Sequence, residues 1–267
     1  MAFAELAAKI SREAGLPMQA YKDKCVRRRI AVRMRACGAH SYAEYQAILD
    51  RSPEEYERLK DAITINVTRF YRNAETWDLL RDTVLRQICV DLRHELRAWS
   101  AGCSSGEEAY TLAMLIADCL ESQGQAERLS LVSIDATDID KECLARAQAA
   151  RYSAEALVEV PPGLAQRYLE KEGSAYRVIE RVRRRVVVRP GDLCTDPPPR
   201  RNYHLILCRN VVIYFGRATQ ERVFTAFTDA LAPGGFLVLG KVETLLGPAR
   251  ERLTLLDPRE RVYQRAA

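Results

Sequence analysis

The sequence predicts a two-part protein: a small all-helical N-terminal domain followed by an α/β domain built on a parallel sheet. Apolar residues among the first 65 positions recur at helical spacing, as in Phe3, Leu6 and Ile10, and no alternating strand pattern interrupts them. From about residue 94, short apolar runs alternate with amphipathic helices. This alternation is typical of βαβ units.

Within the helical domain, Tyr42, Tyr45 and Leu49 mark one further helix, and Pro53 stands near the first position of another. Within the α/β domain, short apolar runs predict buried strands at residues 96–100, 129–134, 186–188, 205–208 and 236–239. Amphipathic patterns predict helices at residues 107–122, 141–150 and 219–231. The runs 253–256 and 261–264 predict a closing antiparallel hairpin.

One stretch, residues 152–189, breaks the alternation. It contains Pro161, Pro162 and Gly163, then a short helix and a basic run with strand-like alternation. We expect a small inserted β-subdomain there. The predicted boundaries are 1–65 for the helical domain, 66–75 for a linker that contributes to the functional site, and 76–267 for the α/β domain with its insertion.

Composition excludes several classes of protein. The 267 residues include 41 Lys and Arg against 36 Asp and Glu, and a net charge of +5 does not by itself indicate nucleic-acid binding. The longest uncharged run, 230–240, is shorter than the roughly 20 apolar residues of a membrane span, and we expect no export signal. The eight cysteines form no Cys-x-x-Cys pair and only three histidines accompany them. We therefore expect a cytoplasmic protein without a disulfide framework or metal site.

The sharpest local motif is residues 99–110, where a strand ends, a turn of small residues follows and a helix begins at Gly106. Small residues let the backbone approach a ligand closely. The first helical turn carries Glu107 and Glu108, which would repel a pyrophosphate but suit a ligand with an ammonium or sulfonium group. S-adenosylmethionine carries both of these charges. By themselves the two acids equally fit a simple role at a helix N-terminus.

A second motif follows the second predicted strand. Asp138 is placed there to accept hydrogen bonds from ribose hydroxyls, and Asp140 is expected to cap the next helix. The alternative is that these aspartates only cap and solvate the turn.

Two more segments carry polar groups without a regular amphipathic face. Residues 66–73 mix polar, aromatic and basic side chains, unlike a plain linker. Residues 208–215 follow a predicted strand, and ligands of open α/β sheets bind beyond the carboxyl ends of strands. Arg209, Asn210 and Tyr214 are therefore candidates for a site, although ordinary packing explains the second segment equally well.

The helix around residues 22–35 contains seven basic residues against Asp23. Helical spacing places Lys24, Arg28 and Arg35 on one face. Such a face fits phosphates or an acidic protein surface, and it also fits a simple solvated face.

Five segments together resemble one family, the bacterial chemotaxis-receptor glutamate O-methyltransferases (the CheR family). They are residues 66–72, 100–108, 137–140, 208–215 and 231–237, and they occur in the family's order and spacing. The resemblance covers nearly the whole chain. It implies a class I S-adenosylmethionine-dependent methyltransferase domain of Rossmann-like fold, with S-adenosyl-L-homocysteine as product.

The resemblance also implies a set of cofactor contacts: Asn66, Thr68, Arg72, Glu108, Asp138, Asp192, Leu193, Arg209 and Asn210. Arg72 and Tyr214 are the candidates for orienting the acceptor carboxylate. Three features depart from the family: Asp192 replaces a usual Asn, Tyr71 replaces a frequent Phe, and the hairpin at 170–176 is shorter than in members that dock on a receptor's C-terminal peptide.

The expected reaction is an in-line transfer of the methyl group to a glutamate oxygen. Glutamate has an ordinary pKa of about 4.3, so the acceptor is ionised at neutral pH and needs no general base. The enzyme's contribution is then alignment, desolvation and charge placement.

The expected partner is the cytoplasmic helical region of chemoreceptors, contacted through the basic helix Lys22–Arg35 by a monomeric protein that binds no nucleic acid and does not insert into membranes. Two other functions stay open. An RNA-directed methyltransferase would use the same basic helix. A catalytically silent S-adenosylmethionine-sensing adaptor would bind the cofactor alone, and the presence of Arg72 and Tyr214 argues against it.

Overall fold

The computed structural model describes residues 2–64, 66–90 and 92–267, and the chain divides into two compact units. The first unit comprises the chain up to Asn66 together with Ile213–Arg222. The second comprises Val67–Val212 together with Val223–Ala267. Each unit has its own buried interior.

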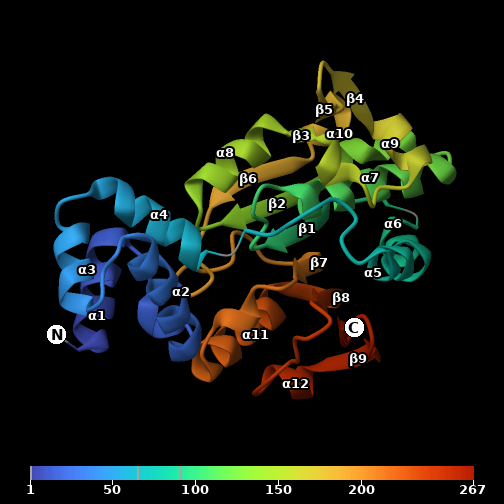
Figure 1. Cartoon of the computed structure of the whole chain (residues 1–267). Coiled ribbons are helices and arrows are strands. Elements are labelled where there is room, and N and C mark those ends of the chain that lie inside the picture. The colour runs from blue at the N-terminus through green and yellow to red at the C-terminus, as the bar shows by residue number, and fades with distance from the viewer. Residues whose placement is uncertain (1, 65, 91) are drawn as a thin grey trace. The chain divides into compact units, whose positions relative to one another are not determined.

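The first unit is helical, as the sequence predicts (Figure 1). Its α-helices are α1 (Phe3–Ala14), α2 (Asp23–Ala36), α3 (Tyr42–Leu49) and α4 (Pro53–Ile63). Their buried faces meet around Leu6, Ile10, Ile30, Tyr45 and Leu59. The hydroxyls of Ser41 and Ser52 accept hydrogen bonds from backbone N–H groups in the first turns of α3 and α4, and Pro53 stands in the first turn of α4. These serines and the proline explain why the two helices begin where they do.

A short stretch from late in the chain folds with these helices. The backbone N–H of Lys22 donates to the carbonyl of Tyr214 over 2.8 Å, and that of Gly216 donates to Ala20 over the same distance. Between them the rings of Tyr21 and Phe215 meet edge-on, with centroids 5.4 Å apart. The antiparallel pairing of Tyr21 with Phe215 joins residues almost two hundred positions apart, and no local sequence pattern predicts it.

One basic residue of α2 is turned inward. Arg33 donates to both carboxylate oxygens of Glu55, at 2.9 and 2.6 Å, and the hydroxyl of Tyr45 donates to the same carboxylate at 2.8 Å. Glu55 is 2% exposed. Because a buried carboxylate needs such partners, Arg33 serves the fold and does not belong to an accessible basic face.

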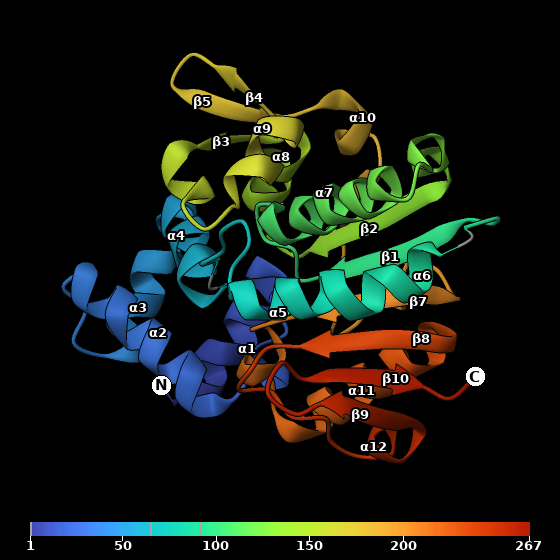
Figure 2. The same cartoon turned by 90° about the vertical axis from the view of Figure 1, so that its right-hand side faces the viewer.

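The second unit is built on a seven-stranded sheet of order β6-β2-β1-β7-β8-β10-β9 (Figure 2). The strands are β1 (Leu96–Ala101), β2 (Val132–Asp138), β6 (Val186–Pro190), β7 (Tyr203–Cys208), β8 (Leu231–Leu239), β9 (Leu253–Asp257) and β10 (Val262–Arg265). The first five run parallel, and β10 is antiparallel to β8 and β9. The predicted parallel sheet and closing hairpin are confirmed. β2 starts later than predicted because residues 126–131 form a 3₁₀ turn.

Helices cover this sheet. They include α7 (Glu107–Ser122), α8 (Lys141–Ala149), α11 (Arg217–Ala230) and α12 (Ala249–Arg252). α7 and α8 pack on β1, β2 and β6. Phe227 of α11 packs edge-on against Trp99 of β1, with ring centroids 5.2 Å apart. Among the described residues, no helix is both long and apolar enough to cross a membrane.

A continuous helical run that the sequence patterns did not predict precedes β1. It consists of α5 (Ala74–Leu79), a π-helical stretch (Leu80–Leu85) and α6 (Arg86–Cys89). Trp77, Leu80 and Val84 are buried in the core of the second unit. Helix therefore begins at residue 74, within the predicted linker 66–75.

The inserted β-subdomain is present as a three-stranded antiparallel sheet of order β3-β5-β4. Its strands are β3 (Arg151–Ser153), β4 (Leu169–Glu172) and β5 (Ala175–Val178), with α9 (Pro162–Tyr168) between β3 and β4. Gly173, with a φ of +63°, allows the tight turn of the β4–β5 hairpin. After α10 (Glu180–Arg183) the chain enters β6, so the last strand within the predicted insertion 152–189 belongs to the main sheet.

Candidate functional site

The turn after β1 brings backbone close to its neighbours. Gly102 and Gly106 have φ values of +81° and +93°, a region that favours glycine. A Cβ on Gly102 would lie 2.6 Å from Cγ2 of Val211, and one on Gly106 would lie 2.8 Å from Cβ of Ala147. Both glycines are therefore required, and Gly106 caps α7 as predicted.

Glu108 in the first turn of α7 is enclosed but still reachable. Its carboxylate accepts a hydrogen bond from Ser100 Oγ at 2.9 Å and lies 3.6 Å from Nη1 of Arg209. The side chain is 13% exposed. Burial raises the pKa of Glu108 above its ordinary value, and the Arg209 guanidinium opposes that rise. Glu107 instead turns to Ser105, whose hydroxyl donates to it.

Asp138 ends β2 beside the same turn. Its Oδ2 accepts the backbone N–H of Ser104 at 2.8 Å, and its Oδ1 accepts that of Asp140 at 3.0 Å. Burial raises the pKa of Asp138, and these N–H donors work against the rise. Asp140 caps α8 by accepting from the backbone of Glu142 and Cys143, as predicted.

Residues 67–73 are integrated into the second unit. Phe70 and Tyr71 are buried in its core, and the backbone N–H of Tyr71 donates to Thr111 Oγ1 at 3.1 Å. Tyr71 and Asn73 have φ values of +57° and +63°, strained positions of a kind that cluster at functional sites. This segment carries the half-buried Thr68 and Arg72.

Arg72 is half-buried, and its Nη1 donates to the carbonyl of Val67 at 2.8 Å. That bond leaves the other donors of its guanidinium fork available. The carbonyl of Arg72 is itself held, by Nη2 of Arg209 at 2.9 Å and by the indole of Trp77 at 3.1 Å.

Arg209 follows β7, and its side chain is 3% exposed. Besides the Arg72 carbonyl, its Nη2 donates to Oδ1 of Asn73 at 3.0 Å, and its guanidinium lies over the Trp77 ring. Burial lowers the pKa of Arg209, and Glu108 opposes that shift. Arg209, a predicted cofactor contact, therefore connects the end of β7 with α7 and with residues 72–73.

The loop after β6 holds Asp192 and Leu193. Asp192 accepts the backbone N–H of Cys194 at 2.8 Å and the hydroxyl of Thr195 at 3.2 Å, so its carboxylate shapes its own turn. Both residues line a cavity of about 200 Å³ together with Trp99.

Two predicted residues belong to the first unit. Asn66 is half-buried, and its side-chain amide donates to Thr64 Oγ1 at 3.5 Å. Tyr214 is half-buried and held by the Lys22 backbone. The second unit brings together Glu108, Arg209 and the Arg72 backbone, and it places Asp138 against the same β1 turn.

Sequence reasoning missed Ser100 and Glu243. Ser100 lies inside the motif 99–110, where the sequence alone does not distinguish it from the other small residues. Glu243 is 2% exposed and accepts three backbone N–H groups, two just after β7 and one just after β8. The only local signal was a charged residue three positions beyond Gly240, where the apolar β8 run ends.

The residues present fit S-adenosylmethionine, the cofactor that the resemblance implies. Partly accessible carboxylates end or follow β1 and β2, and they suit an ammonium or sulfonium group and ribose hydroxyls. Gly102 and Gly106 carry no side chain, so the backbone of this turn can approach a ligand closely.

Comparison with known proteins points the same way. Residues 66–260 match the family described as CheR methyltransferase, SAM binding domain, and residues 1–64 match CheR methyltransferase, all-alpha domain. The chemotaxis protein methyltransferase of Listeria monocytogenes is 32% identical over 248 residues, which cover 93% of this chain and 92% of that protein. The protein of the same description from Escherichia coli is 31% identical over 251 residues, covering 90% and 83%.

Both parts of the sequence match in order, and the matched regions contain the acidic strand ends and the small-residue turn described above. This chain belongs to the CheR methyltransferase family and is an S-adenosylmethionine-dependent methyltransferase.

Proposed function

We propose that the protein methylates glutamate side chains in the cytoplasmic helical region of chemotaxis receptors. The observation that carries this proposal is the match of both parts of the chain to CheR methyltransferases, combined with the carboxylates of Glu108 and Asp138 at the carboxyl ends of β1 and β2. The relatives named above are described as chemotaxis protein methyltransferases.

S-adenosylmethionine supplies, when bound, a methyl group activated by a sulfonium charge. Glu108 is the residue best suited to the cationic part, because its carboxylate is still partly exposed, and Ser100 and Arg209 hold it in place. Asp138 suits the ribose hydroxyls, since it is only partly buried and an ionised carboxylate has more acceptor sites than its backbone N–H donors fill. We assign the remaining contacts to the predicted residues: Asn66, Thr68, Arg72, Asp192, Leu193, Arg209 and Asn210.

Arg72 and Tyr214 are our candidates for orienting the acceptor carboxylate. Arg72 has a planar fork that matches carboxylate geometry. The phenol of Tyr214 offers a single donor. Neither has to remove a proton, because the acceptor is ionised at neutral pH. A few hydrogen bonds are enough to orient the acceptor carboxylate, and more of them would make its oxygen a weaker nucleophile.

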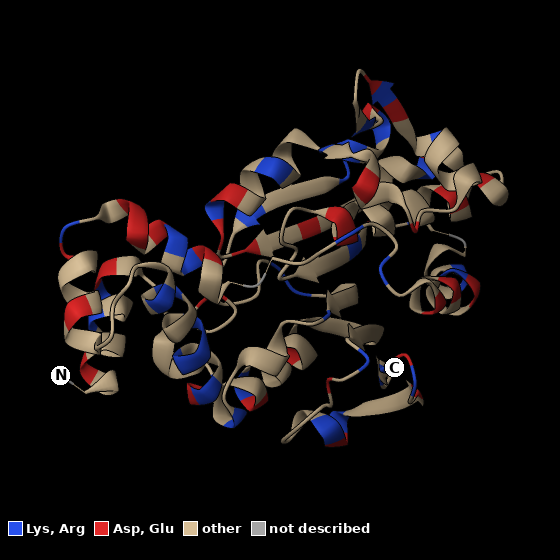
Figure 3. Cartoon of the chain, viewed as in Figure 1, with Lys and Arg blue, Asp and Glu red and all other residues tan. Residues whose placement is uncertain are grey.

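The basic face of α2 is the candidate surface for the receptor (Figure 3). Lys24, Arg28 and Arg35 are exposed, whereas Arg33 is paired with Glu55 inside the unit. An acidic receptor helix would complement the exposed face. We expect a monomeric protein that works in the cytoplasm.

The test is transfer of labelled methyl groups. The purified chain is incubated with methyl-labelled S-adenosylmethionine and receptor-containing membranes, and the labelled protein is treated with mild alkali. Glutamate methyl esters release volatile methanol, so we expect alkali-labile label on a receptor-sized band.

Arg72→Ala should lose this label, and Arg69→Ala is the matched control. Arg69 lies in the same segment but is exposed and paired with Glu159 at 2.8 Å. Label that resists alkali and disappears with ribonuclease would indicate the RNA-directed alternative. Cofactor binding without any label would indicate the silent adaptor.

A further inference from the structure

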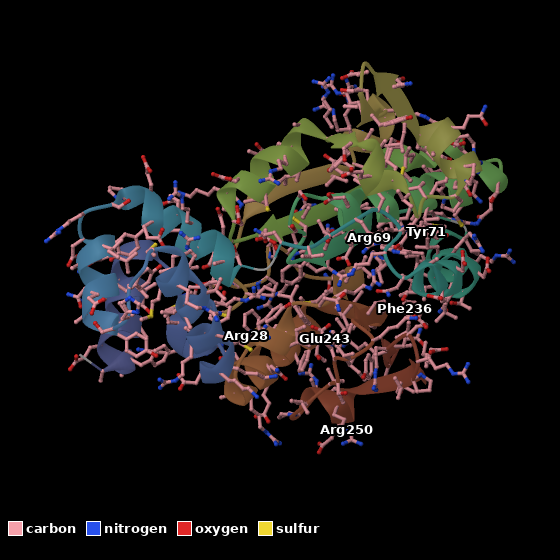
Figure 4. All side chains as sticks on the ribbon, in the orientation of Figure 1. Arg28, Arg69, Tyr71, Phe236, Glu243 and Arg250 are labelled. Atoms are coloured by element: carbon pink, nitrogen blue, oxygen red, sulfur yellow. The ribbon has the colours of Figure 1, made fainter. Side chains whose placement is uncertain are left out.

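We propose that Glu243 is a positioning residue for the cofactor: it holds the backbone of Asn210 and Val211 in the conformation that the cofactor site requires. This inference rests on the proposed cofactor contact at Asn210. Glu243 lies just beyond β8, in the segment that follows Gly240 (Figure 4).

The carboxylate of Glu243 joins two chain segments through main-chain hydrogen bonds. Its Oε1 accepts the N–H of Val211 at 2.9 Å, and its Oε2 accepts those of Asn210 at 2.9 Å and Gly240 at 2.6 Å. The residue is 2% exposed. An ionised carboxylate can accept several such bonds and donates none, so it matches three converging N–H groups.

The backbone it holds is not one that an ordinary residue adopts easily. Asn210 has a φ of +62°, in the left-handed region that non-glycine residues rarely occupy. A Cβ on Gly240 would lie 2.8 Å from the Asn210 nitrogen and 2.8 Å from Oε2 of Glu243. The segments after β7 and β8 therefore approach each other closely, and Glu243 fills the space between their N–H groups.

Glu243 also acts electrostatically on the Glu108–Arg209 pair. The charge of Glu243 raises the pKa of Glu108 and opposes the lowering of the pKa of Arg209. Val211, one of the residues it holds, is also the side chain that faces Gly102 in the turn after β1. A shift of the 210–211 backbone would therefore disturb the turn after β1 as well as the Asn210 contact.

The decisive variant is Glu243→Gln, which keeps the size of the side chain but turns an amide NH₂ toward one of the backbone donors. Such a bond is worth roughly tenfold in an equilibrium constant, so a displaced Asn210 backbone should weaken the cofactor contact by about that factor. We expect the Kd for S-adenosyl-L-homocysteine, measured by calorimetry, to rise by at least that factor. At saturating S-adenosylmethionine, the single-turnover rate should stay within about threefold of the unaltered protein.

Asp257→Asn is the matched control. Asp257 also caps backbone, accepting the N–H of Arg259 at 2.8 Å and of Glu260 at 2.7 Å, in the β9–β10 turn. We expect it to lower Tm without changing affinity. An unchanged Kd in Glu243→Gln, or equal losses of affinity in both variants, would overturn the proposal.

Amide hydrogen exchange of the unaltered protein keeps the inference testable if Glu243→Gln does not fold. The amides of Asn210 and Val211 should be strongly protected before any ligand is added, and exchange at the rate of an unstructured peptide would overturn the proposal. Neither measurement uses a receptor. Failure of receptor methylation with ligand binding intact would therefore count against the proposed function and not against the role of Glu243.

Discussion

The guanidinium of Arg209 lies 3.6 Å from the carboxylate of Glu108, and the two side chains are 3% and 13% exposed. Burial shifts both pKa values toward the neutral forms, raised for Glu108 and lowered for Arg209, while each charge opposes the shift of the other. Asp138 has a raised pKa for the same reason. A cationic ligand group would stabilise the ionised form of Glu108, and hydroxyl donors would stabilise that of Asp138.

This arrangement predicts a proton release on ligand binding. The pKa values of Glu108 and Asp138 in the folded protein lie above their ordinary values, so the folded state binds more protons than the unfolded chain just above those ordinary values. The stability that these acids contribute is present at low pH and is lost as pH rises through the raised pKa values. In the proposed complex, the ammonium group of S-adenosyl-L-homocysteine favours the ionised form of Glu108, and its ribose hydroxyls favour the ionised form of Asp138. Its binding at weakly acidic pH should therefore release protons, seen as a calorimetric enthalpy that depends on the buffer.

Glu108→Gln provides the control for this release, because it removes one of the two titrating acids. The release should become smaller in this variant. An enthalpy that is independent of the buffer in the unaltered protein would contradict the prediction.

The strands and the acids that follow them were predictable because their signals are local. An apolar run, a turn of small residues and the acid after it identify Gly106, Glu108 and Asp138. The helical run 74–89 was not predicted, although Trp77, Leu80 and Val84 stand at helical spacing. The π-helical stretch inside the run has no sequence pattern of its own. Long-range contacts escape sequence patterns altogether.

Two long-range contacts show this limit. Glu243 acquires its role only when β7 and β8 become neighbours and present the backbone of Asn210 and Val211 to it. Arg33 is one of the seven basic residues in residues 22–35, and their spacing does not show that α4 places Glu55 beside it. In both residues, the partner is fixed by packing and not by spacing in the chain.

Replacing Asp138 should weaken cofactor binding, whereas replacing Asp140 should lower stability. A hydrogen bond to a charged group contributes roughly 1.5–3 kcal/mol, so Asp138→Ala should weaken cofactor binding by tens of fold. Asp140→Ala removes the cap of α8 and should cost about 1 kcal/mol of unfolding free energy while leaving affinity nearly unchanged. Calorimetry and denaturant unfolding of both variants check this. Unchanged binding in Asp138→Ala would remove that residue from the site.

The basic face of α2 should serve partner binding. Replacing Lys24, Arg28 and Arg35 by Glu should leave Tm nearly unchanged, because all three are exposed, but should raise KM for receptor methylation. The increase should shrink at high salt, since exposed charges are screened within about 8 Å at physiological ionic strength.

Arg33→Met is the contrasting variant for this face. It leaves the buried carboxylate of Glu55 without its cation, so stability should fall by about 3–5 kcal/mol. A normal KM with a much lower Tm in the triple Glu variant would indicate that the exposed charges serve the fold instead.

Arg72 should matter to the chemical step more than to cofactor affinity. If its guanidinium orients the acceptor, Arg72→Ala should lower turnover by roughly a hundredfold or more, the scale seen when a positioned polar group is lost. Arg69→Ala, in the same segment, should change turnover little because its side chain is exposed and paired with Glu159.

Arg72→Lys separates positioning of the loop from positioning of the acceptor. Lysine can still donate to the Val67 carbonyl, so it should restore the Tm, but it lacks the planar fork and should restore little turnover. If Arg72 instead holds the carboxylate of the cofactor, both substitutions should act mainly on S-adenosylmethionine affinity. Single-turnover rates at saturating cofactor distinguish these two roles. Saturation compensates for weaker cofactor binding, but it does not restore a rate that is low because the acceptor is misaligned. Near-normal transfer by Arg72→Ala under those conditions would exclude the acceptor-orienting role.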